Sequence, residues 1–353
     1  MKNNRFMKAA CVALWMAVAI WPASGGSMIP GVDVSQDAEA SCAINEKGQW
    51  IAAGNMCVVV DGKTVQGLDV SQGYGTGCDV NEKGDWIAVG NVGVAVNGKM
   101  VPGVDVAQAP SVDDDEEESD IFTRAGAAIN ENGQWVAAGN IGVALNGKML
   151  PGIDVSQNQG AGCDINGSGH WIAAGNLCVV VDGKAVSGVD VADGNGGASC
   201  AINERGDWIA AGNIGIAING KMIPGLDVAQ GRGAGCAINN KGEWIAAGNT
   251  GIIVDGHLIP DLDVTDGAQT SCAINEKGQW IAAGNRGIAL NGKMIPGLDV
   301  AQGRGAACDL NNTGDWIAAG NVGVAMGTGR DARTMEVFDR LHEPAREQVS
   351  DIP

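Results

Sequence analysis

The chain has 353 residues, of which 41 are acidic and 22 basic, and its formal net charge is −19. Nucleic acids and anionic lipid surfaces are therefore poor partners, because both carry negative charge themselves. Hydrophobic residues make up 45% of the chain and glycine contributes 56 residues, whereas aromatic residues reach only 4%. Eight of the ten tryptophans recur at matching points of a repeat, which excludes a disordered chain.

Residues 1–26 have the layout of a cleaved secretory signal peptide. Lys2, Arg5 and Lys8 precede thirteen apolar residues, Ala9 to Trp21, and small residues follow. Thirteen helical residues span about 20 Å, which is too short for a bilayer core of about 30 Å. No later segment is long and apolar enough to span a membrane. We therefore expect an exported protein, periplasmic or extracellular.

Repeats of about 36 residues fill most of the remaining chain. Their tryptophans are 36 or 37 residues apart, except for one interval of 49 residues that holds an insert at 109–125. The insert contains the acidic run VDDDEEESD and is predicted to be a solvated loop. The repeat tryptophans are Trp50, Trp86, Trp135, Trp171, Trp208, Trp244, Trp280 and Trp316.

Residues 271–306, SCAINEKGQWIAAGNRGIALNGKMIPGLDVAQGRGA, represent one repeat. Turn-forming residues separate four short segments of strand-like composition, and Asn291-Gly292 is typical of a type I′ hairpin turn. A four-stranded antiparallel meander is therefore predicted for each repeat. The expected strands are 272–275, 279–284, 287–291 and 293–300.

The two ends of the repeat region complement each other. The eighth repeat stops at residue 326 without its fourth strand, and SMIPGVDVSQ at 27–36 supplies one. Closing a ring in this way removes exposed sheet edges. We predict an all-β fold, an eight-bladed β-propeller over 27–326, with an open β-solenoid as the alternative.

The tail at 327–353 leaves the repeat. Met335, Phe338 and Leu341 are spaced to share one face of a short helix. That helix would cap the ring or dock a partner, unless the tail is disordered.

The segment AINEKGQWIAAGN resembles the HAF-type extracellular repeats of bacteria, and the resemblance extends over all eight repeats. It implies an exported β-propeller-like domain without a defined activity. CDVNEKGDWIAVGNVGVAVNG at 78–98 also resembles FG-GAP-type repeats, whose Asp-x-Asn-x-Asp-Gly turn binds calcium. Lys83 and Ile87 stand here where that turn has oxygen ligands.

Calcium is the one cofactor that the sequence suggests, and otherwise none is expected. Calcium needs six to eight oxygen ligands, and two repeats could supply three each from the turn after the first strand. Turn-forming side chains that bond their own backbone are the alternative. The candidate ligands are Asp79, Asn81, Asp85, Asp309, Asn311 and Asp315.

Cysteine stands eight residues before the tryptophan in seven of the eight repeats. If the first strand is innermost, these thiols line the central channel, either as a soft-metal site or as buried apolar side chains. Cys57 and Cys178 occur in addition, and nine cysteines after residue 26 cannot all pair within a monomer. The seven are Cys42, Cys78, Cys163, Cys200, Cys236, Cys272 and Cys308.

An asparagine follows the glycine that ends the second strand in every repeat. These residues should share one rim with the connections between blades, where they either fix turns or read a ligand. They are Asn55, Asn91, Asn140, Asn176, Asn213, Asn249, Asn285 and Asn321.

The leading functional hypothesis is an exported binding or structural module that engages a protein or glycan through its loop rim. A metal-binding protein using channel cysteines or Asp-x-Asn turns is the second hypothesis. The sequence predicts that the chain is not an enzyme, because its three histidines are isolated and near-identical repeats offer few differing groups to converge on a catalytic centre. An enzyme with an unrecognised site is therefore the third. The sequence leaves the oligomeric state and the disulfide pattern open.

Overall fold

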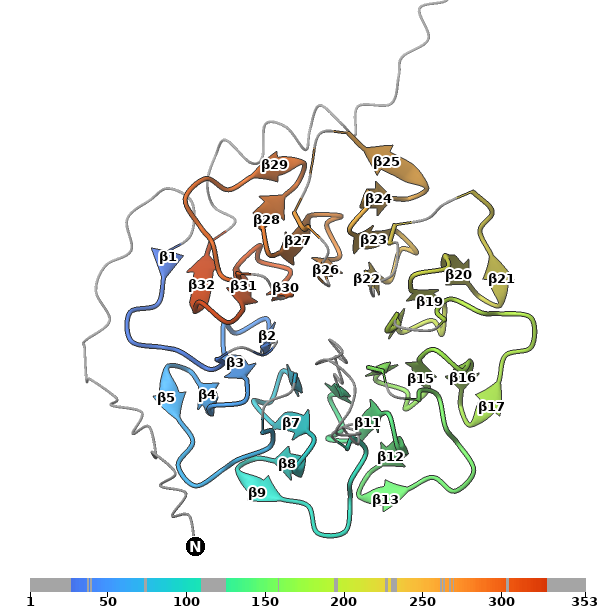
Figure 1. The fold of residues 1–353 in the computed structure, drawn as a ribbon, viewed down its shortest axis with the longest axis horizontal. Coiled ribbons are helices and arrows are strands. Elements are labelled where there is room, and N and C mark those ends of the chain that lie inside the picture. Colours follow the sequence, from blue (N-terminus) through green and yellow to red (C-terminus); the bar gives the residue numbers. More distant parts are fainter. Residues whose placement is uncertain are drawn as a thin grey trace, which may run out of the picture.

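The computed structural model describes residues 27–328, apart from 37, 39, 73–74, 109–124, 158, 194–195, 226–227, 230–233, 261, 263, 267, 269 and 303–304. Eight four-stranded antiparallel sheets form a closed ring, with one strand of each sheet innermost (Figure 1). The eight-bladed β-propeller is confirmed and the solenoid alternative is wrong. The predicted signal peptide, residues 109–124 of the acidic insert and the predicted tail helix lie outside the described residues.

Each blade runs outward from the centre of the ring, and blades are numbered in chain order from blade 1 (β2–β5) to blade 8. The innermost strands are β2 (Ser41–Ile44), β6 (Gly77–Val80), β10 (Gly126–Ile129), β14 (Gly162–Ile165), β18 (Ser199–Ile202), β22 (Gly235–Ile238), β26 (Ser271–Ile274) and β30 (Ala307–Leu310). The second strands are β3 (Trp50–Ala53), β7 (Trp86–Gly90), β11 (Trp135–Gly139), β15 (Trp171–Ala174), β19 (Trp208–Ala211), β23 (Trp244–Gly248), β27 (Trp280–Gly284) and β31 (Trp316–Ala319).

The third and outer strands complete the blades. The third strands are β4 (Val58–Val60), β8 (Gly93–Val96), β12 (Gly142–Leu145), β16 (Val179–Val181), β20 (Ile216–Ile218), β24 (Gly251–Val254), β28 (Gly287–Leu290) and β32 (Val324–Gly327). The outer strands are β5 (Lys63–Thr64), β9 (Lys99–Met100), β13 (Lys148–Met149), β17 (Lys184–Ala185), β21 (Lys221–Met222), β25 (His257–Ile259), β29 (Lys293–Met294) and β1 (Ser27–Met28). The described residues contain no helix, and hence none that could cross a membrane.

Strand β1 closes the ring as the outer strand of blade 8. It pairs antiparallel with β32, with Ser27 opposite Met326 and Met28 opposite Ala325. The amide of Ile29 extends this pairing by donating to the Val324 carbonyl over 2.7 Å. The opening fragment of the chain therefore belongs to the last repeat, as the count of strands predicted.

The outer strand is shorter than predicted. In blade 7 it covers only Lys293–Met294 instead of 293–300. Pro296 lacks an amide hydrogen and Gly297 has φ +76°, so the chain turns there and leaves the sheet. The residues that follow form the connection to the next blade.

Hairpin turns between the third and outer strands follow the type I′ prediction. Asn291 has φ +47° and Gly292 has φ +83°, and six sister hairpins repeat this Asn/Asp-Gly geometry. The Asn291 side chain also accepts a hydrogen bond of 2.7 Å from the Trp280 amide. The turn residue thus ties the hairpin to the second strand.

Tryptophans fill the space between blades. Trp280 and Ala282 share a face of β27 and pack against Ile245 and Ala247 of blade 6. All eight repeat tryptophans are buried, and small residues opposite them allow the blades to approach closely. The core is therefore a ring of interfaces between neighbouring sheets.

Candidate functional site

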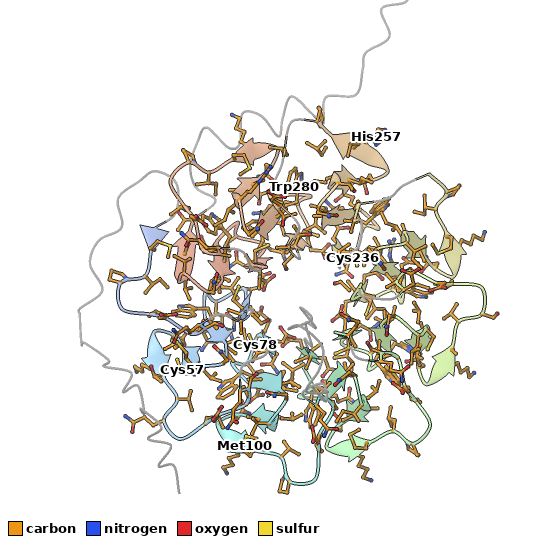
Figure 2. The ribbon with its side chains drawn as sticks, in the orientation of Figure 1. Cys57, Cys78, Met100, Cys236, His257 and Trp280 are labelled. Carbon is orange, nitrogen blue, oxygen red and sulfur yellow. The ribbon has the colours of Figure 1, made fainter. Side chains whose placement is uncertain are left out.

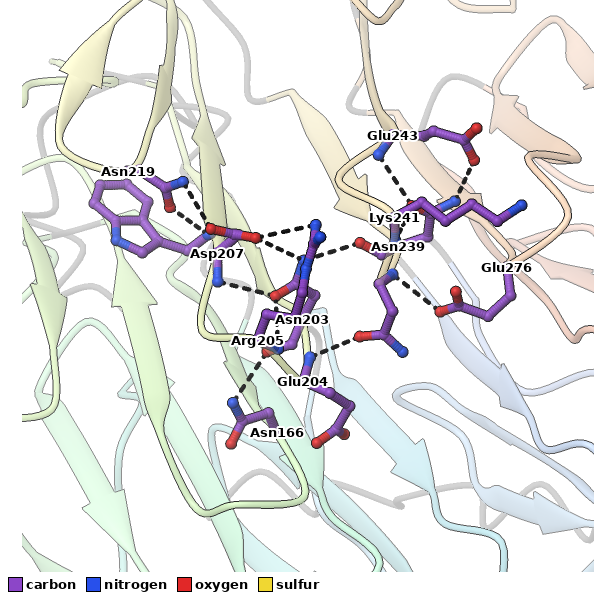
Figure 3. Close-up of polar contacts among 12 residues, drawn as sticks. Asn166, Asn203, Glu204, Arg205, Asp207, Asn219, Asn239, Lys241, Glu243 and Glu276 are labelled. Carbon is purple, nitrogen blue, oxygen red and sulfur yellow. Dashed lines mark hydrogen bonds and ion pairs between the residues drawn. The ribbon is translucent and has the colours of Figure 1, made fainter.

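A closed belt of eight buried asparagines links the blades at one end of the ring. The belt residue follows each innermost strand, and its Nδ2 donates to the backbone carbonyl of the same residue in the next blade, over 2.9 to 3.1 Å. Figure 3 shows three successive members, Asn166, Asn203 and Asn239. The asparagine belt consists of Asn45, Asn81, Asn130, Asn166, Asn203, Asn239, Asn275 and Asn311.

Each belt asparagine also holds its own turn. In blade 7, Asn275 Oδ1 accepts hydrogen bonds from the amides of Lys277 and Gln279, each over 3.0 Å. The last link, from Asn311 to the Asn45 carbonyl, joins residues 266 positions apart and closes the circle. One side chain per blade thus satisfies both the turn and the contact to the next blade.

Three aspartates on innermost strands form a second inter-blade layer, here called the axial aspartates: Asp79, Asp164 and Asp309. Asp79 accepts from the Val80 amide in its own blade over 2.9 Å and from the Ile129 amide in the next blade over 2.8 Å. Asp164 and Asp309 bridge the corresponding amide pairs of blades 4 and 5 and of blades 8 and 1.

Burial makes these carboxyls unusually basic. It raises the pKa of Asp79 to about 7, and the nearby Asp309 and Asp164 carboxylates add to the rise. Burial likewise raises the pKa of Asp164 and of Asp309 to about 6. The centre of the ring therefore changes charge between about pH 6 and 7.

The six candidate calcium ligands are engaged within the protein. Asp79 and Asp309 bind backbone amides, Asn81 and Asn311 belong to the belt, and Asp85 accepts from the Asn97 side chain over 2.9 Å. Asp315 accepts from the Thr313 hydroxyl over 2.9 Å. No group of three His, Cys, Asp or Glu in the described part of the chain is arranged to hold a metal ion. The calcium hypothesis stays a prediction.

The repeat cysteines lie on the innermost strands, as expected, but those with an observed hydrogen bond point toward the preceding blade. Their thiols donate to carbonyls of the preceding blade: Cys163 to Val136 over 3.5 Å, and Cys236 to Ser199 over 3.3 Å. Burial raises the pKa of the Cys236 thiol to about 12, so it stays protonated. No disulfide joins the cysteines that the structure describes.

A small pocket of about 160 Å³ opens at the other end of the centre. It is lined by the first residues of the innermost strands of blades 1 to 7 and by the residues just before these strands, with glycine, alanine, serine and cysteine predominating. Figure 2 shows Cys78 and Cys236 near the centre, far from Met100 on the periphery. This central pocket is one concave feature that the described residues form.

The rim asparagines bind the connections between blades. Asn55 Oδ1 accepts from the Gln36 amide over 2.8 Å, and its Nδ2 donates to the Gln36 carbonyl over 2.7 Å. The same two-point contact recurs at Asn91, Asn140, Asn176, Asn213, Asn285 and Asn321, at the last of these with Gln302. Asn249 has a partner as well. The rim amides therefore already fix the loops beside them.

The residue after each rim asparagine points outward instead. Its amide donates to the connection between blades, as Leu177 does to the Val155 carbonyl over 3.0 Å, while its side chain is exposed. In six blades this side chain is apolar and 37% to 49% exposed, whereas blades 6 and 7 carry Thr250 and Arg286. We call the six the rim apolar ring: Met56, Val92, Ile141, Leu177, Ile214 and Val322.

Comparisons with known proteins identify no family for this chain. No protein-family model and no curated protein match the chain. It is similar to a catalytically inactive virginiamycin B lyase from Staphylococcus aureus, at 11% identity and a TM-score of 0.44, over 86% of this chain and 98% of that one. A gluconolactonase from Xanthomonas campestris is 12% identical, with a TM-score of 0.36, over 84% and 86% of the two chains.

A third similar structure is the extracellular domain of a hybrid two-component system from B. thetaiotaomicron. It is 12% identical, with a TM-score of 0.43, over 84% of this chain but 39% of that one. At such identities and TM-scores the likeness says nothing about function. The eight four-stranded sheets of the structure itself confirm the resemblance to HAF-type and FG-GAP-type repeats only at the level of a β-propeller.

The prediction that the chain is not an enzyme is corrected by these structures. Two of them are enzymes, a lyase and a gluconolactonase, on folds of the same kind. A fold by itself does not decide whether a protein is an enzyme.

Sequence reasoning missed the asparagine belt and the paired roles of the axial aspartates. The signal for the belt was present, because an asparagine directly follows the first strand in all eight repeats. The aspartates were read as ligands within one turn, whereas their second partner lies in the neighbouring blade. That partner becomes visible only once the blades are placed side by side.

Proposed function

We propose that the chain is an exported, protein-binding β-propeller whose partner docks on the connection face. This face is the end of the ring that carries the rim asparagines, the rim apolar ring and the connections between blades. The observation that carries the proposal is the rim apolar ring. Apolar side chains exposed singly are common, but here they occupy one repeat position in six of eight blades.

The face is built to stay in place when a partner binds. Every rim turn donates a backbone hydrogen bond to a connection, over 2.9 to 3.0 Å, and the rim asparagines add two more in most blades. A scaffold held in this way loses little conformational entropy on binding. Loops on rigid scaffolds are where binding residues concentrate.

A protein partner fits the exposed side chains better than a glycan does. Interface cores in protein complexes are apolar and poor in charge, which matches Met, Val, Ile and Leu at the rim. Sugar rings often pack on exposed aromatic faces, and the tryptophans of the described residues are all buried. The partner is thus expected to present an apolar surface to the rim.

The test is affinity capture from the native host, with a matched pair of variants. One variant changes all six residues of the rim apolar ring to serine. The control changes Met100, Leu258 and Met294 to serine; these side chains are 37% to 60% exposed but lie on outer strands. We expect the same captured proteins for the wild type and the control, and at least a tenfold loss for the rim variant.

Capture that is equal for all three proteins, or absent for the wild type, would contradict the proposal. Capture that survives protease treatment of the extract but is lost after oxidation of its glycans would identify a glycan ligand and overturn the protein assignment.

A further inference from the structure

The axial aspartates leave one amide pair of the ring open. The belt residue after each innermost strand donates its amide toward the second strand of the blade, as Asn239 does to the Glu243 carbonyl over 2.9 Å. Amides alternate in direction along a strand, so the last residue of the innermost strand points its amide away from the second strand. Six of these eight amides are bound by Asp79, Asp164 and Asp309. Among the described residues, the amides of Ile238 and Ile274 have no such partner.

The open pair lies where a fourth aspartate would complete the pattern. The axial aspartates stand in blades 2, 4 and 8, and each bridges to the next blade, so blade 6 is the missing position. Blade 6 carries Ala237 there, and Ala237 packs against the core between blades 6 and 7, the side on which a bridging carboxylate would lie. The structure therefore holds three occupied carboxylate positions and one position without its carboxylate.

We propose that the amides of Ile238 and Ile274 bind the carboxylate of a small organic acid. The chemistry is that of the three occupied sites, in which one carboxylate accepts two backbone hydrogen bonds of 2.8 to 2.9 Å from adjacent blades. Hydrogen bonds from amides to a charged acceptor are among the stronger ones. A small acid fits better than a folded partner because the open pair lies inside the ring.

The central pocket comes close to the open amides. Its lining in blades 6 and 7 reaches Cys236 and Cys272, each two residues before an open amide, about 7 Å along the strand. Ile238, Ala237 and Ile274 are partly exposed, so the position is reachable. This site is independent of the rim apolar ring, and either proposal can fail without the other.

Binding should weaken as the pH rises. The groups around the site are Asp79, Asp164 and Asp309 on the other innermost strands and the Cys236 and Cys272 thiols on the two strands of the site itself. The Glu276 carboxylate also lies beside it, on the turn after β26, where it accepts from the Asn240 amide over 3.0 Å. Burial raises the pKa of each of these aspartates to about 6 or 7, so their negative charge develops over that interval. A bound carboxylate is then repelled, since like charges in a buried site disfavour one another.

The experiment is an acetate titration of protein labelled with ¹⁵N-isoleucine, followed by NMR at pH 5.5 and 8. We expect saturable shifts of the Ile238 and Ile274 amide signals, several-fold tighter at pH 5.5, and none with acetamide. Sodium chloride at equal ionic strength is the anion control. The absence of saturable shifts with acetate, or equal shifts with chloride, would overturn the proposal without any variant.

Two substitutions sharpen the result. Ala237→Asp supplies the missing carboxylate, so acetate binding should fall at least tenfold while both amides shift permanently. Ala43→Asp is the control, because the amides it faces, Ile44 and Val80, are already bound by Asp309 and Asp79. If Ala237→Asp binds acetate like the wild type, the site is not where we place it.

Discussion

The asparagine belt and the axial aspartates both link neighbouring blades by hydrogen bonds, in adjacent layers of the ring, but with different symmetry. An asparagine side chain donates and accepts, so one per blade holds its own turn and the next blade, and all eight are present. A carboxylate only accepts, and its two oxygens serve two amides, so one per two blades suffices. Eight carboxylates would also crowd like charges at the centre. The asparagine belt is complete and holds the fold together. The axial aspartates lack one member, and we propose that the amides left there bind a ligand.

Opening the ring should cause the largest loss of stability. Deleting residues 27–36 removes β1 and the fully buried Val34, and leaves β32 with an unpaired edge. We expect a loss of about 4 kcal/mol or more in unfolding free energy, with aggregation through the exposed edge. Denaturant unfolding and light scattering of the two proteins measure this. An unchanged midpoint and a soluble truncated chain would show that closure is not needed.

A single belt link comes next in effect. Asn239→Ala removes the side chain that bonds the Asn275 carbonyl over 2.9 Å and the Lys241 and Glu243 amides. Buried groups left without partners cost about 1–3 kcal/mol each, so we expect a loss of about 2–4 kcal/mol. Asn132→Ala, which removes an exposed asparagine from the corresponding turn of blade 3 and only its surface bond to the Gly167 carbonyl, is the control and should cost under about 1 kcal/mol. Equal losses in thermal or denaturant unfolding would argue against the belt.

The axial aspartates should make the stability of the folded protein depend on pH. Each axial aspartate has a folded pKa above its unfolded value of 3.8, so the folded state holds its protons to higher pH. Stability from this layer is therefore greatest below about pH 4 and falls as the pH rises towards 7, by up to about 1.4 kcal/mol per pH unit for each group. Melting profiles of Asp79→Asn should be flatter than the wild type between pH 4 and 7. The exposed control Asp190→Asn should keep the wild-type profile, and an equal flattening in both would refute the assignment.

The rim should contribute least to stability. Leu177→Ser changes a side chain that is 49% exposed, so the unfolding free energy should shift by less than about 0.5 kcal/mol. A much larger loss in a denaturant titration would mean that the rim apolar ring belongs to the core of the blades and is not a free surface.

Much of the fold could be predicted because each element carries its own local signal. Asn291-Gly292 fixes a hairpin, Trp280 marks a packed second strand, and residues 27–36 match the fragment that the last repeat lacks. The length of the outer strand was overestimated because apolar residues continue beyond Pro296, where the backbone has already turned.

The candidate site was harder to predict, because its contacts cross between blades. Asp79 bonds Ile129, 50 residues away, and Asn311 bonds Asn45, 266 residues away. In the sequence alone, Asp79 and Asn81 look like neighbours in one turn, and Ala237 looks like an ordinary strand residue. Only the assembled ring shows that Ala237 interrupts a pattern.

Hydrogen exchange at the last amide of each of the eight innermost strands tests the account most directly. Amides bound by an axial aspartate and amides without one then occur in the same molecule. Without added ligand, we predict slow exchange at Ile44, Val80, Ile129, Ile165, Ile202 and Leu310, and exchange at least tenfold faster at Ile238 and Ile274. Equal protection at all eight amides would contradict the open pair between blades 6 and 7.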